Sequence, residues 1–202
     1  MSRNGSGVRE AVYVEEVRGV LSLQLFGARA ARDLLARVRK ARGWEFAPVG
    51  VEEPDGGYGV VEAPEDRSAS ALAPGRRSQF EREFDALMDG VVKPLTNNFW
   101  GTSLTRHAST HFVRYSPGDF YLPHTDTTPE EDYRYFTVLC YLNDDFGGGQ
   151  TSFLHLGHAV EPRAGKAIIF PSSYLHGAEP VTAGEKYVVV SWLTGLAPVS
   201  WL

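Results

Sequence analysis

From Thr102 onward the chain consists of short apolar segments, each about five to eight residues long, separated by Gly, Pro and Asp turns. No pattern with helical spacing lies between these segments, which argues against a parallel sheet built with crossover helices. The segments predict strands over five ranges: His111–Tyr115, Tyr135–Leu142, Thr151–Leu156, Lys166–Phe170 and Tyr187–Leu193. The C-terminal half is therefore expected to form an antiparallel barrel or sandwich.

The N-terminal half carries the helical patterns. After a strand expected within Val12–Leu25, with a turn at Gly19, apolar residues at helical spacing predict a helix over 28–42 that ends at Gly43. A second helix is predicted over 78–92, with Ser78 as a candidate cap and Pro94 as its end. Two helices ahead of an all-β half suggest a jelly roll with the helices packed on one outer face.

The length of 202 residues predicts one domain, with a helical support region over about 1–100 and a core over about 102–195. Residues 54–57 are expected to form a turn and residues 64–74 a polar loop, and the 54–77 region is a candidate lid whose role composition does not assign. The sequence contains 43% hydrophobic and 22% charged residues, as in ordinary globular proteins.

Charge and cysteine content narrow the function classes. The net charge of -5, without a basic cluster, argues against a grip on nucleic-acid phosphates. No apolar run has the length of a membrane span, and the first residues lack the apolar core of a signal peptide. The single cysteine, Cys140, is expected in the core and excludes an internal disulfide, so a cytoplasmic location is expected. The sequence does not indicate an oligomeric state.

His124, Asp126 and His176 form the candidate metal site. One residue separates His124 from Asp126, so in an extended segment both side chains project from the same face. Two imidazoles and one carboxylate are the ligand set that holds non-haem Fe(II) and leaves the opposite positions open. Each residue also has an ordinary interpretation: Asp126 as a turn residue, His124 as a surface histidine, and His176 as a loop histidine hydrogen-bonded in place.

The other four histidines and a structural zinc site are the alternatives to this candidate metal site. His107, His111, His155 and His158 are expected to be structural or surface residues, and the first two are expected to point the same way along one strand. A structural zinc site is disfavoured, because such sites usually have four Cys or His ligands and this chain has one Cys.

Lys186 stands at the entrance to an apolar strand, between Glu185 and Tyr187. Most lysines are solvated, but one flanked by apolar residues can point inward, where a buried ammonium requires an anionic partner. The free carboxylate of a metal-bound dicarboxylate such as 2-oxoglutarate would satisfy that requirement.

The segment from Phe112 to Asp126, with Arg114-Tyr115-x-x-Gly118 followed by His124-x-Asp126, resembles the metal-binding segment of the prolyl-4-hydroxylase-like group of Fe(II)/2-oxoglutarate dioxygenases. Further matches follow in order along the chain: Arg134 to Asn143, Gly147 to Phe153, Pro162 to Phe170, His176, and Lys186 with Trp192. The resemblance covers residues 110–195. Gln150-Thr151 replaces the group's usual Glu-Thr, and Arg67-Ser68 only echoes its usual arginine-serine strand.

The resemblance implies a double-stranded β-helix (jelly-roll) core, mainly β with flanking helices. It implies that His124, Asp126 and His176 bind iron and that Lys186 pairs with the distal carboxylate of 2-oxoglutarate. The hydroxyls of Tyr115, Thr137 and Tyr141 would line the co-substrate pocket, and Trp192 would form part of its apolar wall, although core packing explains these aromatic residues equally well.

The implied activity is hydroxylation of a C–H bond with O2, releasing succinate and CO2, with ascorbate as a possible reductant. Retention of the carboxylate ligand Asp126 favours hydroxylation over halogenation, whereas desaturation and cyclisation stay open. A small molecule or an amino acid is the expected substrate, with a prolyl residue of a peptide or protein as the second choice. The rival interpretation is a non-catalytic jelly-roll binding module that retains the metal triad.

Overall fold

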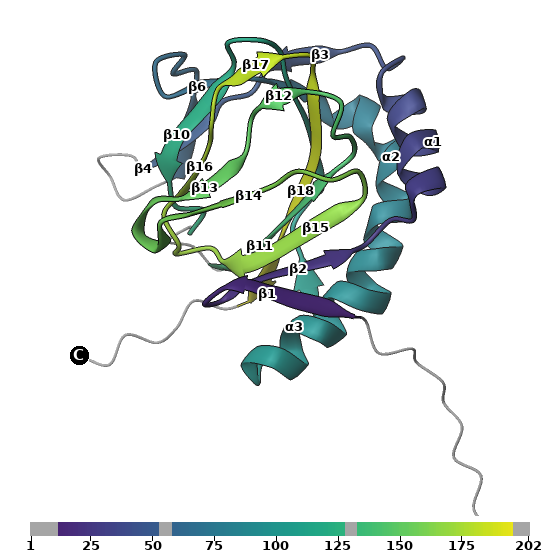
Figure 1. The fold of residues 1–202 in the computed structure, drawn as a ribbon, viewed down its shortest axis with the longest axis vertical. Coiled ribbons are helices and arrows are strands. Elements are labelled where there is room, and N and C mark those ends of the chain that lie inside the picture. Colours follow the sequence, from purple (N-terminus) through teal and green to yellow (C-terminus); the bar gives the residue numbers. More distant parts are fainter. Residues whose placement is uncertain (1–11, 53–57, 128–132, 196–202) are drawn as a thin grey trace, which may run out of the picture.

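The computed structural model describes residues 12–52, 58–127 and 133–195. Two antiparallel sheets face each other and form a jelly roll (Figure 1). The larger sheet has the order β1-β2-β15-β11-β18-β9-β7-β3, with β8 beside β18. Its strands are β1 Tyr13–Val17, β2 Val20–Gln24, β3 Trp44–Phe46, β7 Ser70–Leu72, β8 Arg106–His107, β9 His111–Tyr115, β11 Tyr133–Tyr141, β15 Lys166–Pro171 and β18 Lys186–Gly195.

The smaller sheet has the order β14-β13-β16-β10-β6. Its strands are β6 Arg67–Ser68, β10 Phe120–His124, β13 Thr151–Phe153, β14 His158–Val160 and β16 His176–Ala178. Two separate two-stranded pairs complete the β structure: β4 Val49–Glu52 with β5 Tyr58–Val61, and β12 Gly147–Gly148 with β17 Val181–Ala183. The predicted class, mainly β with a jelly-roll core and flanking helices, is confirmed.

Side-chain alternation along the larger sheet creates two separate cores. In β11, Val138 and Cys140 pack toward the helices, whereas Leu139 and Tyr141 pack toward the smaller sheet. Neighbouring β15 repeats the pattern with Ile169 outward and Ile168 inward. Because successive side chains of a strand point to opposite faces, each strand contributes every second residue to the space between the sheets.

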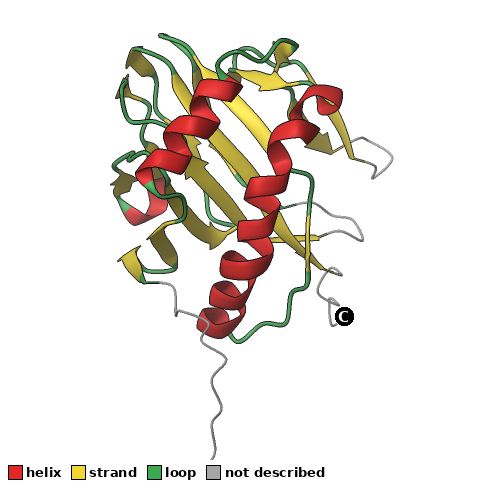
Figure 2. Ribbon diagram, turned by 90° about the vertical axis from the view of Figure 1, so that its right-hand side faces the viewer, coloured by secondary structure: helices red, strands yellow, loops and turns green. Residues whose placement is uncertain are grey.

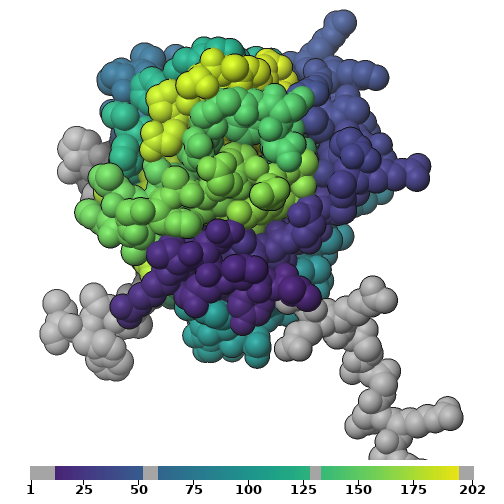
Figure 3. Space-filling model, in the orientation of Figure 1, coloured from purple at the N-terminus to yellow at the C-terminus, as the bar shows by residue number. Residues whose placement is uncertain are grey.

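Three helical segments cover the outer face of the larger sheet (Figure 2). They are α1 Ala28–Val38, α2 Pro74–Leu87 and α3 Lys93–Trp100, with a π-helical turn, Met88–Val92, joining α2 to α3. The apolar stripes of α1 and α2 bury residues such as Leu34 and Phe84 completely. The helices therefore support the sheet from outside, as the sequence predicts. Figure 3 shows the outer surface of the N-terminal hairpin β1–β2 beside β15, with which β2 pairs.

Several predicted helix boundaries are wrong. The first helix ends at Val38 rather than at 42, and the second begins at Pro74, so Ser78 is not its cap. Pro94 does not end the second helix but lies in the first turn of α3, where its missing N–H is no loss. The π-helical turn before it carries the chain past the proline, and Gly101 ends α3 with a left-handed φ of 65°.

Some predicted loops and strands also differ. The expected polar loop at 64–74 contains β6 and β7, which add to both sheets by pairing with β10 and β9. The strand expected over Thr151–Leu156 stops at Phe153, where a short 3-10 turn takes over. The turn expected at 54–57 lies outside the described residues. Across the described residues, no helix has the length and apolar character needed to cross a membrane.

Candidate metal centre

The triad is assembled by two neighbouring strands of the smaller sheet. His124 ends β10 and His176 begins β16, and the two residues are direct partners across this antiparallel pair. Asp126 follows two residues after His124, and its backbone N–H donates to the Ser172 carbonyl oxygen at 2.8 Å. Pairing and this loop contact thus bring His176 next to His124 and Asp126, although His176 lies fifty residues after Asp126 in the sequence.

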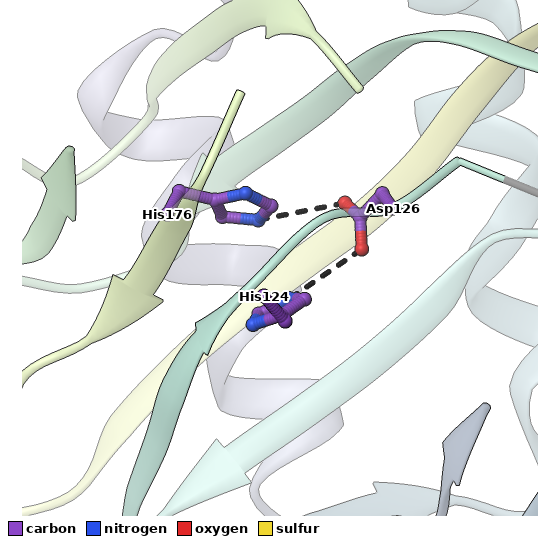
Figure 4. A group of neighbouring side chains, drawn as sticks. All are labelled: His124, Asp126 and His176. Atoms are coloured by element: carbon purple, nitrogen blue, oxygen red, sulfur yellow. Dashed lines mark ion pairs between the residues drawn. The ribbon is translucent and has the colours of Figure 1, made fainter. Parts of the chain in front are cut away.

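Both imidazoles face the Asp126 carboxylate (Figure 4). His124 Nε2 lies 3.4 Å from Asp126 Oδ1, and His176 Nε2 lies 3.5 Å from Oδ2. One ligand atom from each residue lies within 4.8 Å of the others, and no other such cluster occurs among the described residues. The arrangement converges on one point, as a metal centre requires.

The outward nitrogens of the two histidines have backbone partners. His124 Nδ1 lies 2.8 Å from the Leu122 carbonyl oxygen, and His176 Nδ1 lies 2.9 Å from that of Tyr174. Because a carbonyl only accepts, each Nδ1 carries the proton and each Nε2 presents its lone pair to the centre. This is the neutral tautomer that metal binding needs. Residue types, spacing and tautomers all fit a divalent transition metal.

The ionisation states agree with this assignment. Burial raises the pKa of Asp126, but the adjacent imidazoles of His176 and His124 and the Trp192 N–H lower it more, so it lies well below its usual range. Burial lowers the pKa of His176 to about 4, against the opposing effect of Asp126. At neutral pH the site therefore offers a carboxylate and a neutral imidazole, which are the metal-binding forms.

Two side chains from the larger sheet fix the orientation of Asp126. The Thr137 hydroxyl donates to Asp126 Oδ2 at 2.7 Å, and the Trp192 indole N–H donates to the same oxygen at 3.0 Å. Thr137 and Trp192 are direct partners between β11 and β18, so one step of the ladder supplies both donors. Oδ1 receives neither bond, which leaves it available to a metal.

A cavity of about 230 Å³ lies between the sheets beside the triad. Its walls include all three triad residues, together with Tyr115, Thr137, Lys186 and Trp192. Strand alternation explains why these side chains reach the cavity, because Thr137, Lys186 and Trp192 occupy positions of β11 and β18 that face the smaller sheet. The inward orientation expected for Lys186 is found in the structure.

Lys186 is 1% exposed, and burial lowers its pKa to about 7. Its Nζ donates to the Gly149 carbonyl oxygen at 2.7 Å and lies 4.8 Å from the Tyr115 ring centroid. Among the described residues it forms no ion pair. A buried ammonium without a counter-ion is costly, so the cavity is suited to an anion at this end.

The remaining predicted pocket residues divide into two groups. Tyr115 and Thr137 line the cavity, whereas Tyr141 does not. The Tyr141 hydroxyl instead donates to Thr151 Oγ1 at 2.6 Å, and Thr151 lines the cavity. Tyr141 thus contacts the cavity wall from behind.

Three of the cavity residues that the sequence does not predict carry ionisable nitrogen groups: Arg67, His111 and Arg134. The sequence predicts that His111 and His107 lie on one strand and point the same way, but the structure places them on β9 and β8. The His111 ring packs edge-on against Trp192, whereas His107 lies 3.5 Å from Asp85. The alternation from Tyr115 through Val113 to His111 already placed His111 on the inward face of β9. Arg67 had only a weak signal, because Arg67-Ser68 echoes the arginine-serine strand of the resembling group while the composition of residues 64–74 predicts a polar loop.

Comparison with known proteins identifies the family to which the sequence is similar. Residues 110–194 match the family model of the 2OG-Fe(II) oxygenase superfamily. A PKHD-type hydroxylase of Sphingopyxis alaskensis is 32% identical over 151 residues, which cover 69% of this chain and 68% of that protein. A protein of Acanthamoeba polyphaga mimivirus, named for prolyl 4-hydroxylase, is 30% identical over 127 residues. That match covers 50% of this chain, and the chain spans 52% of the mimivirus protein.

A solved structure shows the same fold. A prolyl hydroxylase from Trichoplax adhaerens, in complex with a hypoxia inducible factor peptide fragment, superposes with a TM-score of 0.68 at 16% identity. The superposition covers 89% of this chain and 85% of that one. At this identity the likeness establishes the jelly-roll architecture and leaves the substrate open.

Proposed function

Since the chain belongs to the 2OG-Fe(II) oxygenase superfamily, whose members use Fe(II), 2-oxoglutarate and O2, we propose that it is a hydroxylase. In this proposal His124, Asp126 and His176 bind the iron, and Lys186 binds the distal carboxylate of 2-oxoglutarate. The bound metal and co-substrate supply the oxidising chemistry, with release of succinate and CO2. The observation that carries the proposal is the buried Lys186 sharing one cavity with the converging triad.

The protein's own residues supply position and charge. The two Nδ1–H groups bonded to backbone carbonyls hold the imidazoles with Nε2 toward the metal. Thr137 and Trp192 hold Asp126 Oδ2, which would fix the orientation of the third metal ligand. Lys186 sets the orientation of the co-substrate from the opposite end of the cavity. Apolar walls such as Val113, Leu139 and Val190 limit the access of water.

The substrate belongs to the same proposal at a finer level. A free amino acid or another small molecule is our first candidate, and a prolyl residue in a peptide is the second. The names of the relatives favour a prolyl group, whereas the cavity volume of about 230 Å³ favours a small molecule. We place the protein in the cytoplasm, because its one cysteine, Cys140, is buried and unpaired.

The proposed function is tested with purified protein, Fe(II), 2-oxoglutarate and ascorbate. Under anaerobic conditions the Fe(II)–2-oxoglutarate chelate should give a visible absorption band, and in air the protein should release succinate. Lys186→Met should abolish tight co-substrate binding while retaining metal, and His176→Ala should lose both. A wild-type protein that binds the metal but gives neither band nor succinate would instead support a non-catalytic binding module.

A further inference from the structure

Cationic side chains outnumber acidic ones around the cavity. Arg67, Arg134 and Lys186 line it, and Asp126 is its one acidic residue among those described. If Asp126 binds the metal and Lys186 binds the co-substrate, two guanidinium groups remain. Within the described parts of the chain, neither arginine forms an ion pair with a carboxylate. Two guanidinium groups without a carboxylate partner among the described residues favour an anionic occupant of the cavity.

Arg67 is held in place by groups that leave its charge unsatisfied. Its Nη1 donates to the Pro48 carbonyl oxygen at 3.0 Å, and its guanidinium lies 4.5 Å from the Tyr121 ring centroid. Its Nε is buried without a hydrogen-bond partner. The Tyr121 ring in turn stacks on the His124 imidazole, with centroids 3.6 Å apart. Arg67 is thus separated from a candidate metal ligand by one aromatic ring.

Arg134 lies against an aromatic ring on the larger sheet, as Arg67 does on the smaller sheet. Its guanidinium lies 3.9 Å from the Trp192 ring, and the Trp192 N–H bonds to Asp126. Arg67 belongs to β6 of the smaller sheet and Arg134 to β11 of the larger one. The two cations therefore approach the metal centre from different walls, each across one ring.

Among the described cavity residues, His111 also adds no compensating charge. His111 lines the same cavity, and burial lowers its pKa to about 4, with further lowering by Arg77, Arg134 and Arg67. At neutral pH His111 is therefore an uncharged neighbour. A guanidinium stacked on a ring retains its in-plane N–H donors, and these match the two oxygens of a carboxylate.

We propose that the substrate is a small carboxylic acid whose carboxylate binds Arg67 and Arg134 while one of its C–H bonds lies at the metal. The proposal rests on the hydroxylase function above and narrows its substrate class. A residue in the middle of a peptide has no main-chain carboxylate to offer these arginines.

The experiment compares acids with their carboxamides. The panel contains free L-amino acids including proline, their N-acetyl derivatives, the matching carboxamides, and a prolyl peptide blocked at both ends. Calorimetry with Mn(II) and 2-oxoglutarate measures binding without turnover, and succinate release with Fe(II) measures stimulation. At least one acid should bind, and its carboxamide should bind tenfold or more weakly, the loss expected for a charge-assisted hydrogen bond.

The variants Arg67→Gln and Arg134→Gln should each weaken acid binding about tenfold or more and reduce the preference over the carboxamide. Their affinity for 2-oxoglutarate should stay within about twofold of wild type. Arg67→Lys and Arg134→Lys should retain part of the preference, because the charge is kept and the planar fork is lost. Arg29→Gln is the matched control, since Arg29 is 92% exposed on α1 and should leave all values unchanged.

Four results would overturn the proposal: equal binding of acid and carboxamide, tighter binding of the blocked peptide, binding of no acid, or a large loss of 2-oxoglutarate affinity in the arginine variants. The last result would assign the arginines to the co-substrate. Failure of wild-type protein to bind 2-oxoglutarate with Mn(II) would instead overturn the hydroxylase function. The comparison of acids and carboxamides with Mn(II) alone would then still test the anion preference.

Discussion

The Trp192 indole N–H and the Thr137 hydroxyl donate to the same oxygen, Oδ2 of Asp126, at 3.0 and 2.7 Å. The three residues belong to three different segments, and only the register between β11 and β18 brings the two donors together. Oδ1 lies toward His124 and receives neither bond. The larger sheet therefore orients the one anionic group of the candidate metal centre.

Removal of either donor should weaken metal binding. We expect Trp192→Phe and Thr137→Val each to reduce Fe(II) or Mn(II) affinity about 10- to 100-fold, the usual loss when a partner of a metal ligand is removed. Competition with a chelator measures this affinity. Ser191→Ala is the control, because the Ser191 hydroxyl donates to the Ala108 carbonyl oxygen outside the cavity. Unchanged affinity in both variants would show that Asp126 needs neither bond.

Gly148 should tolerate no side chain. Its φ of 68° is left-handed, and an added Cβ would overlap the Pro180 carbonyl oxygen in the β12–β17 pair. We expect Gly148→Ala to destabilise the protein by about 3 kcal/mol or more, because backbone strain and a clash with rigid backbone combine. Chemical denaturation measures the change in unfolding free energy.

Gly157→Ala is the matched control for the previous variant. Gly157 has a similar φ of 57°, but nothing lies within 4 Å of its added Cβ. It should lose about 1 kcal/mol, from the backbone conformation alone. Equal losses in the two variants would mean that the β12–β17 pair shifts to relieve the clash.

Local patterns were sufficient to predict much of this molecule. The apolar segments after Thr102 predicted an antiparallel jelly roll, and the spacing of His124 and Asp126 predicted a shared face. The inward position of Lys186 followed from the apolar strand that it begins. Each of these inferences depends on alternation or spacing within one segment, which the sequence displays directly.

Long-range pairing explains what the sequence did not predict. Residues 67–72 look like a polar loop, yet β6 and β7 complete the two sheets by pairing with β10 and β9. This pairing places Arg67 in the cavity, and in the sequence only the weak Arg67-Ser68 echo indicates such a strand. From the sequence alone, Pro94 predicts the end of a helix. The structure instead has a π-helical turn before it, whose residues Met88 and Val92 pack in the core, and local helix propensity does not report such packing.

Tyr141 and Tyr115 should have different roles in spite of their shared resemblance to pocket residues. The Tyr141 hydroxyl bonds to Thr151 and does not reach the cavity, whereas Tyr115 lines it. We expect Tyr141→Phe to cost about 1 kcal/mol of stability, the net value of one buried hydrogen bond, with little change in 2-oxoglutarate affinity. Tyr115→Phe should weaken that affinity more. Denaturation and calorimetry measure the two effects, and the opposite ranking of affinities would reverse the assignment.

The charge of Lys186 should make co-substrate binding depend on pH. In the free protein burial lowers the pKa of Lys186 to about 7 from its ordinary 10.5, so above pH 7 the folded lysine is mostly neutral while the unfolded one is charged. The unfolding free energy of the free protein should therefore increase as the pH rises from about 7 to 10.5. A bound dicarboxylate favours the charged form of Lys186, so the protein should take up a proton when 2-oxoglutarate binds between about pH 7 and 10.5.

The affinity for 2-oxoglutarate should consequently fall about tenfold per pH unit above pH 7. Calorimetry with Mn(II) in buffers of different ionisation enthalpy measures both the affinity and the proton uptake. In Lys186→Arg the guanidinium stays charged throughout this range, so its affinity should be nearly independent of pH. A wild-type affinity that stays constant from about pH 7 to 9, without proton uptake, would show that neutralisation of Lys186 does not limit binding.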